Sequence, residues 1–346
     1  MVKAMIIKDN LRALSEIAKG IGFMRFGWPK VIPRLINLPV TYRCNSKCTF
    51  CSIWKKKPGS EFTAAEFEKF IEKNRPLFIG YTGGEPFLRE DLASLWVKAN
   101  TNFSVFTNGI LTDKILSTIE EFIPKAKKPF YVDVSMDGFE ETHNNLRGVN
   151  IYHKAMQTLA GLKALSDKNS LMSCGASFTV CAQNQDEFVD FYGHMNAKGF
   201  DVGFRVVNFN SYYGTTDQSI NLDVERFLSQ VERIPKTNYI LLLRKYLKNP
   251  AQVVACAAGF TSAWINPDWS VFPCISREDY VVGNLKDVGF DLKNIWFNEK
   301  MNSFRAGIKN HKCHCFTDCE IYNSMRHDPR HLVGICLRKG KLVSSQ

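Results

Sequence analysis

The stretch Thr-Tyr-Arg-Cys-Asn-Ser-Lys-Cys-Thr-Phe-Cys-Ser-Ile-Trp, residues 41–54, is the most informative part of the chain. Its cysteines, Cys44, Cys48 and Cys51, are spaced x3 and x2 and follow the apolar run 36–40. This pattern predicts a strand that gives way to a loop with three sulfurs in one small volume. Thiolates hold iron–sulfur clusters, which usually take four protein ligands. Three local thiolates would leave one iron open to a substrate or cofactor.

Two other interpretations of this triplet stay open at this point. A zinc site favours paired Cys-x2-Cys or Cys/His knuckles with four protein ligands. A disulfide needs an oxidising compartment. Neither explains three cysteines within eight residues as directly as a cluster loop does.

Length and composition set the class of protein. The 346 residues have room for one barrel-sized domain and a smaller one, and 45% apolar with 23% charged residues is ordinary for a packed soluble protein. We find no uninterrupted apolar run of membrane-spanning length and no signal-peptide pattern in the first 30 residues. The 11 cysteines therefore suggest a reducing cytoplasm. We expect a cytoplasmic protein, with contact to a membrane surface as an alternative.

The net charge of +11 is concentrated at the start of the chain. Residues 1–40 hold seven Lys/Arg against Asp9 and Glu16, which gives +5. A single apolar helical stripe recurs through the same segment, at Ile7, Leu11, Leu14, Ala18 and Ile21. We expect a helix that packs across the catalytic domain; the alternative is an interfacial element at a lipid surface.

Apolar runs and helical segments alternate after the cysteine loop. Strands alternating with helices of 10–15 residues predict βαβ units and a parallel sheet. Capping patterns at Thr63/Glu66 and Asn184/Glu187 open two of the helices. We expect strands at 36–40, 77–82, 103–106, 130–136, 171–180 and 202–207, with helices at 63–74, 89–99, 112–122, 151–165 and after 184.

Polar motifs fall at the carboxyl ends of these strands, where parallel α/β folds place ligands. Gly83-Gly84-Glu85-Pro86 follows the second strand, Thr107-Asn108-Gly109 the third and Ser135-Met136-Asp137-Gly138 the fourth. In this order behind the cysteine loop, the sequence over residues 36–210 resembles the radical S-adenosylmethionine (radical SAM) core. The resemblance implies a partial (β/α)6 parallel barrel whose loop binds a 4Fe-4S cluster chelated by SAM.

The same resemblance implies individual cofactor contacts. Phe50 matches the family's aromatic before the last cysteine. Gly83, Gly84 and Glu85 match the motif that binds the methionine amino group of SAM. Ser135 and Asp137 take the place of residues that contact the ribose, and Asn108 is a further candidate at its strand end.

Six more cysteines lie in the last part of the chain. The text around Cys256 and Cys274 resembles the SPASM/twitch extension, which holds one or two auxiliary 4Fe-4S clusters. Trp269 departs from the family's usual glycine, and the later cysteine run is incomplete. We therefore expect one auxiliary cluster in a loop-rich segment, with structural zinc as the alternative; His311, His314 and His327 fit surface residues better than ligands. Cys174 and Cys181 fit small core residues. The candidate ligands are Cys256, Cys274, Cys313, Cys315, Cys319 and Cys336.

These expectations divide the chain into an amphipathic helical segment (1–35), the core (36–210), a helical bridge (211–255) and a small Cys-rich extension (256–346). The resemblance implies an enzyme that reductively cleaves SAM and abstracts a substrate hydrogen, with auxiliary clusters aiding the reaction. Its partners would be an electron donor such as flavodoxin or ferredoxin and a small-molecule, peptide or lipid substrate. The alternatives are a membrane-associated lipid-modifying member and a zinc-dependent nucleic-acid-binding module. We do not expect nucleic acid as a partner, because the basic residues beyond the first helix are dispersed.

Overall fold

Six parallel strands cross the sheet in the order of the sequence. The computed structural model describes residues 2–57, 59–216, 221–310, 313 and 315–331, with side chains from residue 11 onward. Each strand pairs in parallel with the next, as the predicted βαβ alternation requires. The strands are β1 (Leu35–Thr41), β2 (Phe78–Gly83), β3 (Asn102–Thr107), β4 (Phe130–Ser135), β5 (Met172–Val180) and β6 (Val202–Val206).

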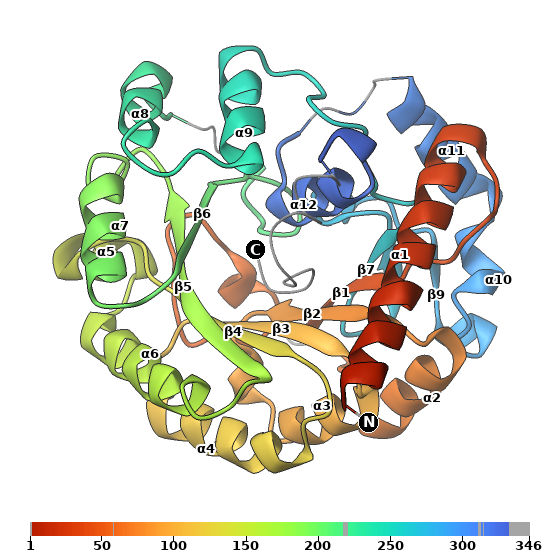
Figure 1. Ribbon diagram of the computed structural model, residues 1–346, viewed down its shortest axis with the longest axis horizontal. Helices are drawn as coiled ribbons and strands as arrows, with labels where there is room; N and C mark the ends of the chain where they lie inside the picture. The colour runs from red at the N-terminus through yellow and green to blue at the C-terminus, as the bar shows by residue number, and fades with distance from the viewer. Residues whose placement is uncertain (1, 58, 217–220, 311–312, 314, 332–346) are drawn as a thin grey trace.

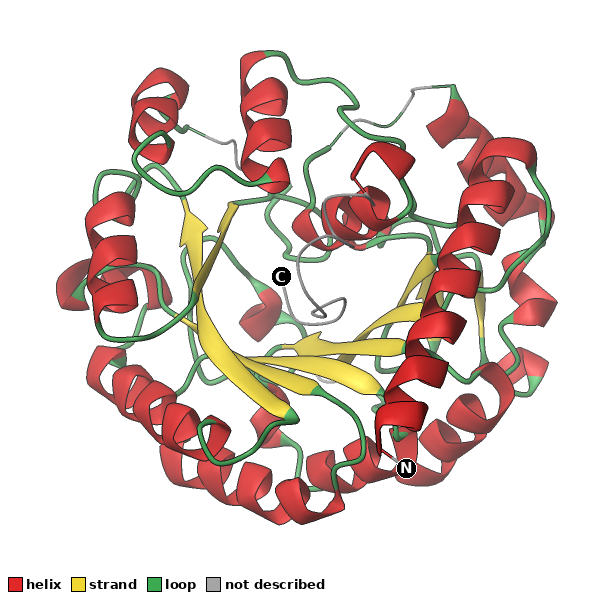
Figure 2. Cartoon of the chain, in the orientation of Figure 1, coloured by secondary structure: helices red, strands yellow, loops and turns green. Residues whose placement is uncertain are grey.

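Helices cover the outer face of this curved sheet, and the sheet does not close (Figures 1 and 2). The result is the predicted partial barrel, with its amino and carboxyl strand ends forming two rims. The helices between and after the strands are α2 (Ala64–Asn74), α3 (Leu92–Ala99), α4 (Thr112–Phe122), α5 (Glu140–Arg147), α6 (Tyr152–Ser166), α7 (Phe188–Ala197), α8 (Val224–Val231) and α9 (Asn238–Lys248).

The C-terminal part continues the same sheet. Strand β7 (Ser262–Ile265) pairs in parallel with β1, and β8 (Ser270–Phe272) and β9 (Gly283–Asn284) follow as antiparallel neighbours, so that one nine-stranded sheet runs β6-β5-β4-β3-β2-β1-β7-β8-β9. Strands β7 and β8 form a hairpin between Cys256 and Cys274. Helices α10 (Lys293–Trp296) and α11 (Glu299–Lys309) follow the sheet, and α12 (Asp318–Arg326) lies within the segment from Cys313 onward that was expected to be loop-rich.

Local sequence chemistry explains where several elements start. The Thr63/Glu66 capping box is formed in full at the start of α2. Asn184 does not cap α7: its side chain bonds the backbone of Cys181, Asp137 and Thr179 instead. The helix expected from residue 89 begins only at Leu92, because Arg89 bonds Asp91 and the carbonyls of Val40 and Phe62.

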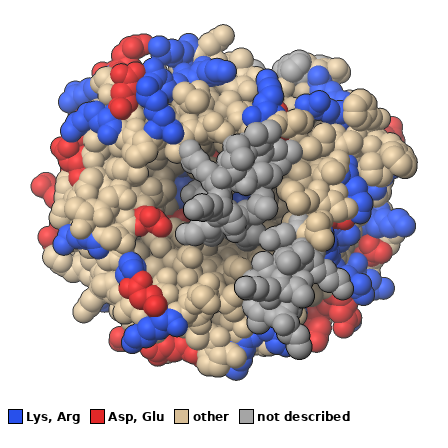
Figure 3. Space-filling model, in the orientation of Figure 1, with Lys and Arg blue, Asp and Glu red and all other residues tan. Residues whose placement is uncertain are grey.

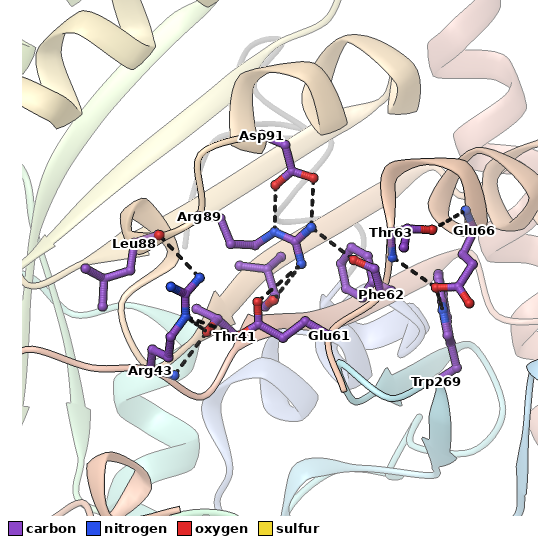
Figure 4. Close-up of polar contacts among 11 residues, drawn as sticks. Thr41, Arg43, Glu61, Phe62, Thr63, Glu66, Leu88, Arg89, Asp91 and Trp269 are labelled. Atoms are coloured by element: carbon purple, nitrogen blue, oxygen red, sulfur yellow. Dashed lines mark hydrogen bonds and ion pairs between the residues drawn. The ribbon is translucent and has the colours of Figure 1, made fainter. Parts of the chain in front are cut away.

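Trp269 adopts a left-handed backbone conformation, with φ of 71°, that normally favours glycine. Its side chain is fully buried between Phe62, Phe70 and Phe290. Its indole nitrogen also donates to Glu66 at 3.4 Å, as Figure 4 shows. Aromatic packing therefore offsets the backbone cost at the position where the sequence departs from the resembled family.

The first helix, α1 (Val2–Phe26), lies across the barrel next to the C-terminal helices (Figure 1). It does not pack through the predicted stripe: Leu11 is 62% exposed and Leu14 is 38% exposed, and the side chain of Ile7 lies outside the described part. The opposite side makes the contact. Phe23 is buried, and Gly20 sits against the His327 ring so tightly that a Cβ there would approach the ring to 2.7 Å.

His327 should make folding stability depend on pH. It is packed against α1, with Nδ1 2.9 Å from the carbonyl oxygen of Asn323, and is not the surface histidine expected from the sequence. Burial lowers the pKa of His327 from 6.5 to about 4, with Arg326 adding to the effect. Because the folded pKa lies below the unfolded one, the neutral ring contributes stability above pH 6.5 that is lost as the pH falls toward 4.

Urea unfolding at pH 7 and pH 5 tests this prediction. The wild type should lose about 2 kcal/mol more than His327→Gln over this interval. His153→Gln is the matched control, because the His153 side chain is 78% exposed and should leave the pH dependence unchanged. Equal pH dependence in the wild type and His327→Gln would contradict the assignment.

Candidate functional site

The cysteine loop leaves β1 at the carboxyl rim of the barrel. Cys44, Cys48 and Cys51 all line one cavity of about 220 Å³, together with Phe50. Burial raises the pKa of Cys44 to about 11 and that of Cys51 to about 12, and the neighbouring thiols add to the effect. Three half-buried thiols that line one cavity have the donor chemistry that an iron–sulfur cluster requires. A bound metal would favour their thiolate forms.

Main-chain contacts hold this loop against the next strand end. The N–H of Gly84 donates to the Thr41 carbonyl and that of Glu85 to the Arg43 carbonyl, both at 2.8 Å. A Cβ on Gly83 or Gly84 would lie 2.2 or 2.1 Å from these same carbonyl oxygens. The two glycines are therefore required by the close approach of two backbones, whatever they contact in the cavity.

A second set of contacts holds the loop from α5. The N–H groups of Lys47 and Thr49 donate to the carbonyls of Arg147 and Leu146. Gly148 ends α5 with a φ of 65°, and a Cβ there would meet the Lys47 carbonyl oxygen at 2.4 Å. The sequence analysis did not predict α5, whose C-terminal end at Arg147 and Gly148 contacts the cysteine loop.

Polar contacts at the end of β1 complete the support (Figure 4). Arg89 is buried and forms a two-pronged ion pair with Asp91, with both N–O distances 2.8 Å. It also donates to the Val40 carbonyl at 3.0 Å and the Phe62 carbonyl at 3.1 Å. Arg43 donates to the Thr41 hydroxyl and to the Leu88 carbonyl. The strand end that carries the cysteine loop is thus fixed by the segment that follows Pro86.

The predicted cofactor residues divide into two groups. Phe50, Gly83, Gly84, Asn108 and Ser135 line the cavity. Glu85 and Asp137 are buried beside it and already have partners. Glu85 accepts from the Thr107 hydroxyl at 2.9 Å and from the Asn108 N–H at 2.8 Å, and burial raises its pKa to about 7.

Asp137 forms a buried ion pair with Arg147 and accepts from the Thr179 N–H at 2.8 Å. Arg147 in turn lies 3.7 Å from the sulfur of Cys48 and 5.7 Å from the centre of the Phe50 ring. The guanidinium therefore connects the strand-end aspartate to the cysteine loop. The sequence analysis did not select Arg147 as a site residue.

The far wall of the cavity carries residues that the sequence analysis did not select. Arg205 on β6 lies between Asp133 and Asp318, at 3.7 and 3.8 Å, and stacks over Phe106. Burial raises the pKa of both aspartates to about 6, against the lowering effect of Arg205. The sequence signal that could have identified Arg205 is an arginine in the middle of the predicted strand 202–207.

The C-terminal cysteines separate into two positions. One small cavity beside Glu320 is lined by Cys256, Cys313 and Cys315. Cys274 is buried, and its thiol contributes to raising the pKa of Cys313. Cys319 faces the large cavity instead, near Cys51 and Tyr213. Hydrogen bonds from Cys313 and Thr317 lower the pKa of Cys315 to about 6. Cys336, His311 and His314 lie outside the described residues, and Cys174 and Cys181 are buried as expected.

The described residues contain neither a preformed metal-ion site nor a disulfide. Within the described ranges, no three Cys, His, Asp or Glu side chains converge closely enough to hold a single metal ion. All ten cysteines of the described part are free thiols. On the face drawn in Figure 3, Lys and Arg are spread around the periphery among acidic residues, without the continuous stripe that nucleic acid favours.

Comparisons with protein families match both halves of this arrangement. The model of the radical SAM superfamily matches residues 38–195, and that of an iron–sulfur cluster-binding domain, SPASM, matches residues 256–320. Fe-coproporphyrin III synthase of Methanosarcina barkeri is 25% identical over 79% of this chain and 75% of its own length. The sporulation killing factor maturation protein SkfB of Bacillus subtilis is 24% identical over 82% of this chain and 69% of its own.

Solved structures show the same fold. Streptococcus suis SuiB bound to S-adenosylmethionine has a TM-score of 0.61 at 16% identity, over 80% of this chain and 68% of that chain. The protein anSMEcpe with bound AdoMet and a Cp18Cys peptide has a TM-score of 0.60 at 22% identity, over 79% and 82% of the two chains. At these identities the likeness establishes the partial-barrel fold.

Gly84→Ala should loosen the cysteine loop. The added methyl group would overlap the Arg43 carbonyl, so we expect a loss of about 1–3 kcal/mol in the free energy of unfolding, with faster labelling of the loop thiols by a thiol reagent. Gly193→Ala is the control, since no atom lies within 4 Å of a Cβ at that helix position. Equal stability of the Gly84 variant and the wild type would contradict the close-approach argument.

Proposed function

Because the chain is a radical SAM enzyme with a C-terminal SPASM extension, we propose that Cys44, Cys48 and Cys51 ligate the SAM-binding 4Fe-4S cluster and that the cavity beside them takes the substrate. When bound, the reduced cluster and SAM supply a 5′-deoxyadenosyl radical that abstracts a hydrogen atom. The observation that carries the proposal is that all three loop thiols line one cavity with the residues of the strand-end motifs.

In this proposal the chain positions SAM through its strand-end groups. Gly83 and Gly84 offer backbone atoms, and Asn108 and Ser135 offer side-chain hydrogen bonds to the polar parts of SAM. The predicted contacts of Glu85 and Asp137 stay predictions. Their present partners suggest that they also act indirectly: Glu85 orients Asn108 and Asp137 orients Arg147.

Replacing Cys44, Cys48 and Cys51 together with alanine should abolish formation of 5′-deoxyadenosine under anaerobic, reducing conditions. The triple variant should still fold, because the loop is held mainly by backbone bonds from Gly84, Glu85, Lys47 and Thr49. Matched circular dichroism of the variant and wild type would establish folding. Continued SAM cleavage by the triple variant would overturn the ligand assignment.

We further propose one auxiliary 4Fe-4S cluster, held by Cys256, Cys274, Cys313 and Cys315. Support comes from the common cavity of three of these residues and from the electrostatic effect of Cys274 on Cys313. Four thiolates complete the ligand set of one cluster. Cys319 would then be a free thiol on the substrate side of the module.

Iron and sulfide content distinguishes these roles. In the variant that lacks Cys44, Cys48 and Cys51, about four irons and four sulfides per chain should remain. Adding Cys315→Ala should lower this content, whereas adding Cys319→Ala should leave it unchanged. About eight irons would indicate two auxiliary clusters, and loss of iron from the Cys319 variant would contradict the proposed set.

For the substrate we propose a peptide. The names of relatives include both a tetrapyrrole synthase and a peptide maturation protein, and one structural neighbour is described as SuiB bound to the precursor peptide SuiA. A tetrapyrrole bears several carboxylates that need cationic partners. The cations among the described cavity residues are Arg147 and Arg205, and aspartates already occupy both. A neutral or cationic peptide side chain fits this charge balance better.

Deuterium transfer tests the substrate class. A mixture of short peptides built from deuterated amino acids should place deuterium in 5′-deoxyadenosine, and Asp318→Asn should reduce the transfer while SAM cleavage without substrate continues. Formation of Fe-coproporphyrin III from a tetrapyrrole precursor, with no deuterium transfer from any peptide, would replace the peptide proposal with a tetrapyrrole one.

We propose peripheral contact with an anionic membrane as a second property. Phe26 and Trp28 are 81% and 76% exposed, the largest values among the exposed large apolar side chains of the described residues. Leu11 and Leu14 are further exposed apolar residues on α1, and Arg25 precedes Phe26 in the chain. Exposed aromatics with basic neighbours on a helix favour the interface of anionic lipids. No helix in the described part is long and apolar enough to cross a bilayer.

Co-sedimentation with phosphatidylglycerol vesicles tests this contact. The double variant Phe26→Ser/Trp28→Ser should bind the vesicles about tenfold more weakly than the wild type, while Val97→Ser/Leu241→Ser, which changes exposed apolar residues elsewhere, should bind normally. Equal binding of both variants would overturn the proposal. A dimer that only the first variant loses would indicate a second copy as the occupant.

A further inference from the structure

A second cavity lies at the opposite rim of the barrel from the cysteine loop. Its floor comes from the amino ends of the strands, at Leu35, Phe78 and Asn102. Helix α1 and the end of α12 close it from the other side. Its volume of about 230 Å³ equals that of the catalytic cavity, at about 220 Å³. A ligand of comparable size can therefore enter it, although the proposed radical chemistry takes place at the other rim.

Most of the wall is apolar, which favours a hydrocarbon group in the ligand. The aliphatic and aromatic side chains come from α1, from the segment before β1, and from the starts of β1 and β2. They are Ile17, Val31, Ile32, Leu35, Leu77 and Phe78.

The charged residues of the wall are mainly cationic. Three arginines, Arg12, Arg34 and Arg326, line the cavity, against one carboxylate, Glu16. Glu16 is already paired, with Lys19 at 2.9 Å and with Arg34 at 3.3 Å. The cavity therefore carries a positive charge that its own carboxylate does not neutralise.

Two of the arginines have partners within the protein. Arg34 donates to Glu16 and to the carbonyls of Asn74 and Arg75, at the end of α2. Arg12 donates to the Arg75 carbonyl at 3.3 Å. Both guanidiniums thus stabilise the C-terminus of α2, where carbonyl groups lack helical partners.

Arg326 is different. Within the described ranges it forms no hydrogen bond and no ion pair, and burial lowers its pKa. The adjacent His327 is uncharged at neutral pH and bonds the Asn323 carbonyl, so it does not compete for an anion. Arg326 is half-buried and has no counter-ion among the described residues, and its planar donors match a carboxylate or a phosphate.

We propose that this cavity binds an amphiphilic anion: an apolar chain in contact with Ile17, Ile32 and Phe78, ending in a carboxylate or phosphate held by Arg326. The site is independent of the cluster assignments, because it shares no residue with the catalytic cavity. Binding to it should also stabilise the contact of α1 with the barrel, since α1 forms one of its walls.

Calorimetric titration of the purified enzyme with four probes tests the proposal. Octanoate and hexyl phosphate carry the two head groups, and their relative affinities identify which is preferred. Octanol and hexyltrimethylammonium are the neutral and cationic controls. Both anions, or one of them, should bind at least about tenfold more tightly than the controls. Absence of anion binding, or equal binding of octanol, overturns the proposal.

Arg326→Gln should weaken anion binding by about tenfold or more, whereas Arg233→Gln, an exposed arginine on α8's C-terminal side, should leave it unchanged. Without ligand, Arg326→Gln should unfold at the same temperature as the wild type or higher, because it removes a half-buried charge that has no partner among the described residues. A lower unfolding temperature or failure to fold would show that Arg326 has a structural partner, and would overturn the proposal. Ala13→Leu provides a second variant: it fills the cavity from α1, keeps Arg326 and should also weaken binding.

Discussion

The structure depends on two backbone hydrogen bonds that join the end of β1 to the loop after β2. They require the chains to approach within a distance that no side chain at Gly83 or Gly84 would allow. The cysteine loop starts at this junction, so its direction is determined by main-chain geometry. Arg89 also stabilises this junction by donating a hydrogen bond to the Val40 carbonyl. The carbonyls at the end of α5 accept hydrogen bonds from the other end of the loop. The three thiols can therefore be presented to one cavity before any cluster binds.

The same rim combines groups from distant parts of the sequence. Arg147 connects Asp137 with Cys48, and Arg205 lies between Asp133 and Asp318. Each arginine has an acidic partner, which limits the cost of burying the charge. The charges of the catalytic cavity are consequently balanced within the protein. This balance distinguishes it from the cavity at the other rim, where Arg326 has no such partner among the described residues.

Local patterns predicted the elements whose signals are local. The predicted α4 agrees with the structure at both ends, and the capping box of α2 forms in full, because periodicity and capping act within a few residues. The sequence analysis missed α5 and α12, because these short helices are mostly polar and contain few apolar residues, and it could not foresee that β7 joins β1. The spacing of Cys44, Cys48 and Cys51 was sufficient to predict that their sulfurs lie close to one another. The separation of Cys319 from Cys315 depends on the helix that starts at Asp318 and could not be read from the intervals.

The pairing of β7 with β1 changes how the two parts of the chain can have evolved. Strand β1 has neighbours on both sides, β2 from the core and β7 from the extension, so it is an interior strand of one sheet. A core without the extension would expose β1 as an edge, with unpaired N–H and C=O groups beside the cysteine loop. Gain or loss of a SPASM module by an ancestor would thus have required another segment to cover this edge. The boundary at residue 256 is where the second family model begins, but a continuous hydrogen-bonded sheet joins the two parts.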